Sequence, residues 1–435
     1  MEVPTLSERK QPDMADEYRH LVGIDWATEA HEVCVLDSTG QVVARRQVKH
    51  TADALHTLFE ELLRFANGLP EQVAVGIETP RGAVVESLVE RGFHVYALNP
   101  KQMDRFRDRH TVAGAKDDHL DSFVIGDALR TDLRLFRRVR LDDPLIIQVR
   151  ELSRISDDLR VELGRLVNQL REQVYRLMPQ LLTLSPVADE PWLWDLLELV
   201  SAGTDPARIR PTQVERILRN NRIRRLKADD VLEQLRLEPP WTAPGTQSAV
   251  RTHIALLLPR LRVTLQQDRD CDKQIARLLE ELSHQEPVEG EIREHRDVSI
   301  LQSLPGAGMN VIATMLAEAS QPLADRNYHA LRARAGIAPV TKASGKRSKA
   351  RAVVHMRYAC CGRLRNAFFW WAQTAISIDD GAKTHYAALR QRGHSYPRAL
   401  RSVADRLLRI LVAMLANGTL YEPHRGVTRP ALASD

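Results

Sequence analysis

The order of strands and helices that the sequence predicts between residues 20 and 138 constrains the fold more than any other feature. Apolar residues that alternate with polar ones predict strands, and apolar residues three and four apart predict helices. Strands are predicted at 21–26, 31–37, 41–49, 72–78 and 93–98, and helices at 51–65, at about 82–90, from 100 and from 117. Three strands followed by alternating helices and strands predict an α/β ribonuclease H-like domain over residues 20–138.

Four carboxylates occupy the ends of these predicted elements. Asp25 ends the first strand and Glu78 ends the fourth, and these two strands are neighbours in a ribonuclease H-like sheet. Asp118 and Asp121 are three residues apart, so on a helix they lie on one face about one turn from each other. Because carboxylates this close repel one another, we expect two Mg²⁺ ions among them, acting on a phosphodiester.

Each acid also has a structural alternative. Aspartates are common in the first turn of a helix, where they cap backbone N–H groups. Asp25 could instead hydrogen-bond the loop that follows it, and Glu78 could cap the next helix. Asp117 is ambiguous because it lies four residues before Asp121, and Lys116 faces a phosphate, a neighbouring acid or solvent.

The middle of the chain, residues 139–295, is predicted to be helical. Apolar residues recur three and four apart over about Leu145–Leu177 and Ser248–His284, which predicts two long amphipathic helices or coiled-coil arms. These helices could pack antiparallel within the chain or across a dimer. An insert at about 181–248 holds the basic run Arg219–Lys227, which either grips a phosphate backbone or is a solvated helix face.

Residues 296–425 are predicted to form a mainly helical domain. The run Leu304-Pro-Gly-Ala-Gly308 before a helix has the form of a helix-hairpin-helix turn, although an ordinary helix connection is the alternative. In such a turn, Gly306 and Gly308 let backbone N–H groups approach a phosphate. Three further helices are expected near the end of the domain, with the aromatic run Phe368–Trp371 in their core.

A basic stretch without acids lies within this last domain. Residues 342–365 include eight lysines and arginines and no aspartate or glutamate, so nucleic acid is the expected partner. The residues expected to contact it are Lys342, Lys346, Arg347, Lys349 and Arg351. Ser344 lies in the same stretch, where surrounding cations would activate its hydroxyl as a nucleophile. A turn residue or a hydrogen-bond donor to phosphate is the alternative for this serine.

Composition narrows the environment of the chain. The 435 residues carry a net charge of +5, and the uneven spread of the basic residues suggests a polyanionic partner. The four cysteines include no Cys-x-x-Cys spacing, which suggests a reducing compartment and no zinc site. Since no run approaches the ~18 apolar residues of a membrane span, we expect a cytoplasmic protein that does not contact membranes.

Six short motifs are distributed over the first and last domains. They are Gly23-Ile-Asp25, Gly76-Ile-Glu78, Ala115-Lys-Asp-Asp-His-Leu-Asp121, Leu304-Pro-Gly-Ala-Gly308, Ala335-Gly-Ile-Ala-Pro339 and Ser344-Gly345. Together, and in this order, they resemble the DEDD transposases of the insertion sequence 110 family. The acidic helix of that family usually has Thr, Arg and Ala where this chain has Asp117, His119 and Ser122.

The resemblance implies a specific chemistry and a set of partners. It implies a RuvC-like domain in which Asp25, Glu78, Asp118 and Asp121 hold Mg²⁺, and a C-terminal domain in which Ser344 attacks DNA to form a covalent phosphoserine. It also implies donor and target double-stranded DNA, and a structured guide RNA from the same element. The protein would be a homo-oligomer, either a dimer or a tetramer, whose active sites combine the acids of one protomer with the serine of another.

Three other functions are compatible with parts of the sequence. The run Gly23–Thr28 also resembles the phosphate-binding hairpin of actin-like ATPases. A RuvC-like junction-resolving nuclease would need the four acids but not Ser344. A nucleic-acid-binding protein could keep the fold without the chemistry.

Overall fold

The chain divides into two compact units, one up to Leu141 and one from Asp142. The computed structural model describes residues 18–80, 82–110, 118–140, 142–238, 242–284, 296–342 and 353–423. The predicted division into three domains stays a prediction, and each of the two units is described by itself.

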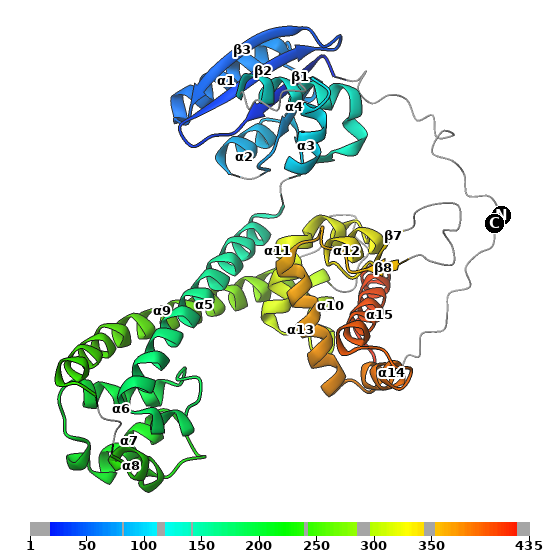
Figure 1. Cartoon of the computed structure of the whole chain (residues 1–435). Helices are drawn as coiled ribbons and strands as arrows, with labels where there is room; N and C mark the ends of the chain where they lie inside the picture. Colours follow the sequence, from blue (N-terminus) through cyan, green and yellow to red (C-terminus); the bar gives the residue numbers. More distant parts are fainter. Residues whose placement is uncertain are drawn as a thin grey trace. The chain divides into compact units, whose positions relative to one another are not determined.

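The first unit is a six-stranded mixed sheet with helices on both faces, consistent with the predicted ribonuclease H-like domain (Figure 1). Its strand order is β3-β2-β1-β4-β5-β6, and β1 pairs antiparallel with β2 and parallel with β4. The elements are β1 (His20–Asp25), β2 (Ala30–Asp37), β3 (Val42–Lys49), α1 (Ala52–Phe65), η2 (Pro70–Gln72), β4 (Val73–Ile77), α2 (Ala83–Glu90), β5 (His94–Ala97), α3 (Pro100–Arg107), α4 (Asp118–Asp132), η3 (Leu133–Leu135) and β6 (Arg137–Arg138).

The predicted strands and helices of this unit are confirmed to within one residue at their stated ends. The side chain of Thr51 caps α1 by accepting a hydrogen bond from the Ala54 amide. The short strand β6 was not predicted. Its two arginines have no apolar alternation, and among the described residues it joins the sheet through its antiparallel pairing with β5.

Alternation along β1 divides its residues between two cores. Val22 and Ile24 pack with α1 and α2, whereas Gly23 faces α4. A Cβ atom at Gly23 would lie 1.9 Å from the carbonyl oxygen of Ser122 and 2.7 Å from the amide nitrogen of Gly126. The backbone of α4 therefore lies directly against the backbone of β1, which a larger residue at position 23 would prevent.

The second unit is mainly helical. Its longest helices, α5 and α9, pack side by side (Figure 1). The elements are α5 (Pro144–Leu177), η4 (Pro179–Thr183), α6 (Pro191–Ser201), η5 (Pro206–Arg208), α7 (Pro211–Asn220), α8 (Ala228–Arg236), α9 (Pro244–His284), α10 (Asp297–Ser303), α11 (Met309–Ala324), α12 (Tyr328–Arg334), β7 (Val340–Lys342), β8 (Val353–His355), α13 (Gly362–Ile378), α14 (Asp380–Gln391) and α15 (Tyr396–Asn417). Within the described ranges of both units, no helix combines the length and the apolar character needed to span a membrane.

The two long helices run antiparallel, since the start of each helix lies in the same core as the end of the other. Val149, near the start of α5, shares a core with Leu279 near the end of α9, whereas Val174, near the end of α5, shares a different core with Val250 near the start of α9. Between these ends, the hydroxyl of Ser156 donates a hydrogen bond of 2.7 Å to the buried Asp268 carboxylate. The predicted long helices are thus present, while a coiled-coil packing pattern stays a prediction.

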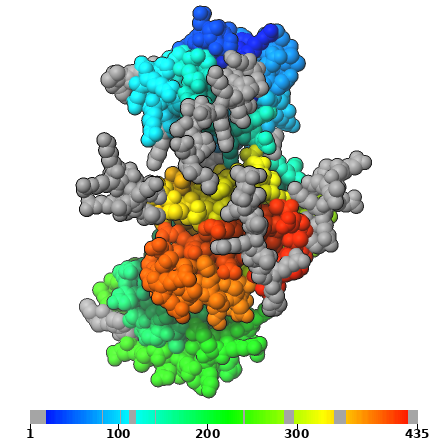
Figure 2. Space-filling model, turned by 90° about the vertical axis from the view of Figure 1, so that its right-hand side faces the viewer, coloured from blue at the N-terminus to red at the C-terminus, as the bar shows by residue number. Residues whose placement is uncertain are grey.

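Separate hydrophobic cores lie at the two ends of this helix pair. Helices α6, α7 and α8 enclose one core around Trp192 and Trp194, and α10 to α15 enclose the other around Phe368 and Trp371 (Figure 1). The residues of α10 to α15 form one continuous body, coloured yellow to red in Figure 2.

The aromatic run Phe368–Trp371 in the middle of α13 is only half in the core. Phe368 and Trp371 are fully buried, but 37% of Phe369 and 61% of Trp370 is exposed. The prediction that all four aromatic residues are buried is therefore wrong for the middle two. Consecutive residues on a helix point about 100° apart, so four in a row cannot all face the same core.

The contact between β1 and α4 predicts the stability of a pair of glycine variants. Gly23→Ala forces the Ser122 backbone to move, and we expect it to lower the free energy of unfolding by about 2 kcal/mol or more. Gly164→Ala is the control, because no atom of the described residues lies within 4 Å of a Cβ at that position of α5. It should instead stabilise α5 by about 0.5–1 kcal/mol. Urea unfolding followed by circular dichroism measures both changes, and an unaffected Gly23→Ala protein would contradict this account of the packing.

Candidate functional site

The sheet brings two of the predicted acids to the same edge. Strands β1 and β4 are parallel neighbours in which Ile24 is paired with Ile77. Asp25 is the last residue of β1, and Glu78 directly follows β4. The two carboxylates therefore occupy adjacent positions where the parallel strands end, as the strand order predicted.

Both of these acids lie on the face of the sheet that α4 covers. Gly23 and Gly76 meet α4, since a Cβ on Gly76 would lie 2.6 Å from the Ile125 side chain. Side chains two residues apart on a strand share a face. Asp25 and Glu78 each follow one of these glycines by two residues. They therefore lie on the face of the sheet that α4 covers, just past the point where the helix and the strands are closest. Both acids are partly exposed at this edge.

Helix α4 adds Asp121, which is buried and held by an arginine from α3. Only 6% of Asp121 is exposed, and Arg107 Nε donates a hydrogen bond of 2.6 Å to its Oδ1 atom. Arg107 Nη1 also lies 3.1 Å from Asp104 Oδ1. The hydrogen bond that Arg107 donates to Asp121 raises the pKa of Arg107 against the effect of burial, and the charges of Asp121, Asp104 and Glu78 raise it further. The guanidinium group of Arg107 thus interacts electrostatically with both Asp121 and Glu78.

The remaining predicted residues cannot all be placed. Asp118 is the first residue of α4, one turn before Asp121, but its side chain is outside the described residues. The same is true of the Lys342 side chain, although its backbone ends β7. Seven further predicted residues lie wholly in segments outside the described ranges: Lys116, Asp117, Ser344, Lys346, Arg347, Lys349 and Arg351.

The described residues fit a divalent cation in donor chemistry, but they do not form a complete ligand set. Across the described ranges, no group of three or more His, Cys, Asp or Glu residues is arranged to hold a metal ion. The acids at this edge offer carboxylate oxygen atoms, which are the ligands that Mg²⁺ prefers. Arg107 already supplies one positive charge to Asp121 and Glu78.

Two residues beside this edge were missed by sequence reasoning. Arg107 is one, and Glu32 of β2 is the other. Glu32 is paired in register with Asp25, is only 8% exposed, and accepts a hydrogen bond of 2.8 Å from Gln47 Nε2. His119 Nδ1 of α4 lies 3.1 Å from its other oxygen atom. Glu32 could have been found from the sequence, because it is a glutamate within the largely apolar run of β2.

The turn between α10 and α11 uses its two glycines differently. Gly306 has a φ of +76°, and a Cβ there would lie 2.8 Å from the backbone nitrogen of Ala375 in α13. Gly308 is the N-cap of α11, and a Cβ added to it would have no atom of the described residues within 4 Å. Close packing against α13 explains Gly306, whereas the surroundings of Gly308 leave space for a ligand. Phosphate binding by either glycine stays a prediction.

A short hairpin frames the segment that contains Ser344. Strands β7 and β8 pair antiparallel, and Lys342 is opposite Val353. The residues before and after the segment 343–352 are therefore held together at its base. Downstream of β8, the Cys361 amide donates a hydrogen bond of 2.8 Å to the Arg334 carbonyl oxygen, which ties the start of α13 to the end of α12.

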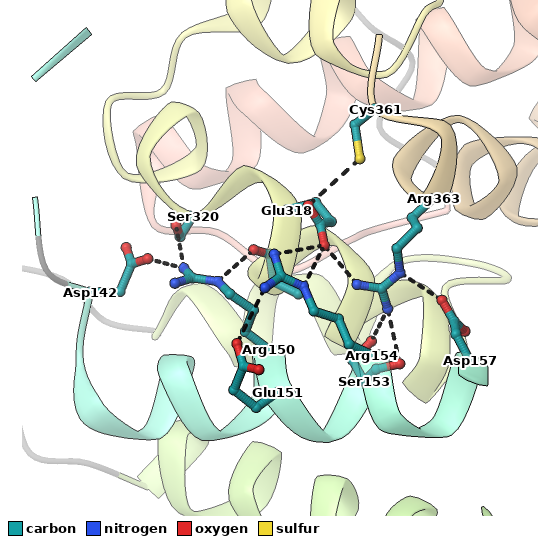
Figure 3. Close-up of polar contacts among 11 residues, drawn as sticks. Asp142, Arg150, Glu151, Ser153, Arg154, Asp157, Glu318, Ser320, Cys361 and Arg363 are labelled. Atoms are coloured by element: carbon teal, nitrogen blue, oxygen red, sulfur yellow. Dashed lines mark hydrogen bonds and ion pairs between the residues drawn. The ribbon is translucent and has the colours of Figure 1, made fainter. Parts of the chain in front are cut away.

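A buried carboxylate fixes three helices of the second unit to one another (Figure 3). Glu318 of α11 is 10% exposed at its side chain and accepts a hydrogen bond of 2.6 Å from Arg363 of α13. Arg154 of α5 lies 3.4 Å from the same oxygen atom. Arg363 also binds Asp157 at 2.6 Å and the hydroxyl of Ser153, both on α5. These contacts hold the C-terminal helices against the long helix α5.

The charge balance in this network sets the protonation of Glu318. Burial by itself would raise the pKa of the Glu318 carboxyl. The positive charges of Arg154 and Arg363, together with their hydrogen bonds, outweigh burial and hold the pKa below its ordinary value of 4.5. Glu318 is therefore a carboxylate throughout the neutral range.

Two family models match parts of this chain. A model described as "Transposase", for the DEDD transposases of IS110, matches residues 22–179, and one described as "Transposase IS116/IS110/IS902 family" matches residues 298–387. The first match includes all four predicted acids, and the second includes Ser344 and the basic stretch around it. The segment between the two matches contains α6, α7 and α8.

Individual relatives extend this similarity along the chain. The "Putative transposase y4uE" of Sinorhizobium fredii (strain NBRC 101917 / NGR234) is 44% identical over 49% of this chain, which spans 60% of that relative. The "Mini-circle putative transposase for IS117" of Streptomyces coelicolor is 30% identical over 89% of this chain and 91% of its own length. The uncharacterized 43.6 kDa protein of insertion element IS110, from the same organism, is 27% identical over 92% and 95%.

The pairing of Arg107 with Asp121 predicts a change in metal affinity. Because a divalent cation must compete with the guanidinium group, Arg107→Met should bind Mn²⁺ about tenfold more tightly, equivalent to about 1.4 kcal/mol. Arg105→Met is the control, since Arg105 is exposed on the same helix. Isothermal titration calorimetry measures both affinities. Unchanged or weaker binding by the Arg107 variant would show that the arginine does not compete with the metal.

The Glu318 network predicts a stability that depends on pH. Glu318→Gln leaves Arg154 and Arg363 without their shared carboxylate and should cost about 3–5 kcal/mol at neutral pH. Since the pKa of Glu318 is lower in the folded state, its contribution is complete above about pH 4.5 and is lost as the pH falls through the folded-state value. The difference between the variant and the unchanged protein should therefore shrink in acid.

A neighbouring glutamate provides the control for this experiment. Glu151 also pairs with Arg154, at 3.2 Å, but 60% of its side chain is exposed. Glu151→Gln should cost less than about 1 kcal/mol. Urea unfolding at several pH values measures all three proteins, and equal destabilisation of the two variants would contradict the role given to Glu318.

Proposed function

Since this chain belongs to the IS116/IS110/IS902 transposase family, we propose that it is a DNA transposase and recombinase that cuts and rejoins DNA strands. The observation that carries the proposal is the gathering of acids beside α4. Asp25 and Glu78 lie at the ends of adjacent parallel strands. Arg107 is paired with Asp121 and also interacts electrostatically with Glu78. The family match over residues 22–179 includes Gly23–Thr28 and favours this function over an actin-like ATPase.

The acids are proposed to hold magnesium at this edge of the sheet. The proposed ligands are Asp25, Glu78, Asp118 and Asp121, with two Mg²⁺ ions. Bound magnesium would stabilise the negative charge that develops on a phosphate under attack. The buried position of Asp121 supports this role, because a buried carboxylate needs a permanent positive partner. Arg107 provides that partner until a cation competes for the same oxygen atoms.

Ser344 is proposed as the nucleophile. Its Oγ atom would form a bond to phosphorus while a P–O bond of the DNA backbone breaks, and the proton released by Oγ would end on the departing oxygen. The product is a phosphoserine ester and a free DNA hydroxyl group. Attack by a hydroxyl group of another strand would break the Oγ–P bond, return the proton to Ser344 and rejoin the DNA.

The basic residues are proposed to hold the nucleic acid during these steps. Contacts to phosphates are assigned to Lys116, Gly306, Gly308, Lys342, Lys346, Arg347, Lys349 and Arg351. For the lysines and arginines from Lys342 to Arg351 this follows from the charge of the stretch, which has no acid between residues 342 and 365, whereas Lys116 is assigned from its place beside the acids. The space around Gly308 at the N-terminus of α11 favours it over Gly306 for direct contact.

The proposed partners follow from the family resemblance. They are donor and target double-stranded DNA, a structured guide RNA from the same element, and further copies of this chain in a dimer or tetramer. The acids belong to the unit that ends at Leu141, and Ser344 belongs to the unit that begins at Asp142. An active site that combines one protomer's acids with another's serine is compatible with this division. The proposed site of action is the cytoplasm.

Two serines of the same segment allow a direct test of the nucleophile. The full-length protein is expressed with the DNA that flanks its coding sequence and with the RNA that copurifies, and protein–DNA adducts are separated on denaturing gels. Ser344→Ala should reduce the adduct by at least about a thousandfold. Ser348→Ala, four residues away, should leave it nearly unchanged.

The acids and an alternative function are tested in the same assay. Asp25→Asn should abolish both the adduct and strand cleavage, with folding checked by thermal unfolding. Cleavage that persists in Ser344→Ala without any adduct would contradict serine chemistry and favour a junction-resolving nuclease. Full strand exchange by either variant would contradict the proposed mechanism as a whole.

A further inference from the structure

A group of exposed arginines lies on α7 and on the turn that follows it. Residues 206–227 include eight lysines and arginines but only one acid, Glu215. All seven arginines of this range are exposed. Four of them lie on α7 or on the turn after it and have no guanidinium hydrogen bond or ion pair among the described residues. These four residues, here called the arginine surface, are Arg216, Arg219, Arg222 and Arg224.

The helix orients the first two arginines away from the core. Val214, Ile217 and Leu218 are the buried residues of α7 and pack in the core around Trp192. Arg216 and Arg219 are three residues apart on the opposite, solvent-facing side, about 5–6 Å from each other at their Cβ atoms. The charges of these two arginines are therefore presented to solvent from the same side of α7.

Hydrogen bonds anchor both ends of the turn after α7, and these contacts constrain the backbone that carries the other two arginines. Before them, Asn221 Nδ2 donates hydrogen bonds to the Asp195 carboxylate at 2.8 Å and to the Ile217 carbonyl oxygen at 3.0 Å. After them, Arg225 binds both oxygen atoms of Glu190, at 2.8 and 2.7 Å. Among the described residues, the fold thus pairs Arg225 with an acid but provides none for Arg222 or Arg224.

The backbone at Arg222 has a conformation that arginine rarely adopts. Its φ of +57° is in the left-handed region, which glycine and asparagine favour at the position after a helix. Another residue there costs of order 1 kcal/mol. The chain accepts this cost at a position where the guanidinium group has no hydrogen-bond partner in the described part of the protein.

We propose that the arginine surface binds the phosphate backbone of double-stranded DNA. This inference rests on the proposed function, which makes DNA the substrate. Four exposed guanidinium groups match phosphates in charge and in hydrogen-bond geometry. Single-stranded nucleic acid is disfavoured, because sites for it also present aromatic side chains for base stacking, and residues 206–227 contain none.

The position of the surface gives it a role apart from the chemistry. Helices α6 to α8 lie at the end of the α5–α9 pair opposite α10 to α15 (Figure 1). A 34-residue helix such as α5 is about 50 Å long. The arginine surface also lies between the two segments that the family models match. It would therefore hold duplex DNA far along the length of the DNA from strands β7 and β8, without reading its sequence.

The test compares two variants of equal charge in the full-length protein. One replaces the arginine surface, as Arg216→Gln, Arg219→Gln, Arg222→Gln and Arg224→Gln. The control replaces exposed arginines spread along α5 and α9, as Arg165→Gln, Arg260→Gln, Arg269→Gln and Arg277→Gln. Binding to a 60-base-pair DNA duplex and to an RNA duplex of equal length is measured by fluorescence anisotropy over a range of salt concentrations.

We expect the surface variant to bind the DNA duplex at least tenfold more weakly than the control variant. The slope of log affinity against log salt should flatten by about 0.9 for each phosphate that is no longer neutralised. Equal weakening in both variants, no weakening, or weakening confined to the RNA duplex would overturn the proposal. Because binding is measured without cleavage, these results stand whether or not the Ser344 adduct forms, so failure of the proposed function is recognised separately.

Discussion

The acid site depends on the contact between the backbones of β1 and α4. At Gly23 the helix approaches so closely that a single methyl group would overlap the Ser122 carbonyl oxygen. Asp25 follows Gly23 by two residues on the same face, and Asp121 precedes Ser122 on the helix. The separation between the backbone positions that carry the acids of the sheet and the acid of the helix is therefore set by this backbone packing.

Much of the first unit could be predicted from its sequence, because its elements follow simple periodic patterns. The adjacency of Asp25 and Glu78 followed from strand order alone, since parallel neighbours end at the same edge. Arg107 was not predictable in this way. Its partner, Asp121, lies fourteen residues further along the chain, so their contact depends on how α3 packs against α4 and not on spacing within one helix.

Elsewhere, prediction failed where local pattern and tertiary packing differ. Four aromatic residues in succession suggested a core, but helical geometry exposes Phe369 and Trp370. Glu32 was passed over because β2 reads as an apolar strand, and only the register with β1 places it opposite Asp25. The metal ligation, the nucleophile and the basic contacts remain predictions, since they rest on residues such as Asp118 and Ser344 that pattern can nominate but not position.

The two ends of the α5–α9 pair have separate hydrophobic cores, so the two cores can accumulate substitutions independently. Substitutions that alter one core do not disturb the packing of the other, because the helices between them are joined mainly by their own seam. The bundle of α6, α7 and α8 can therefore be enlarged, shortened or given another surface charge while the packing of α10 to α15 is preserved.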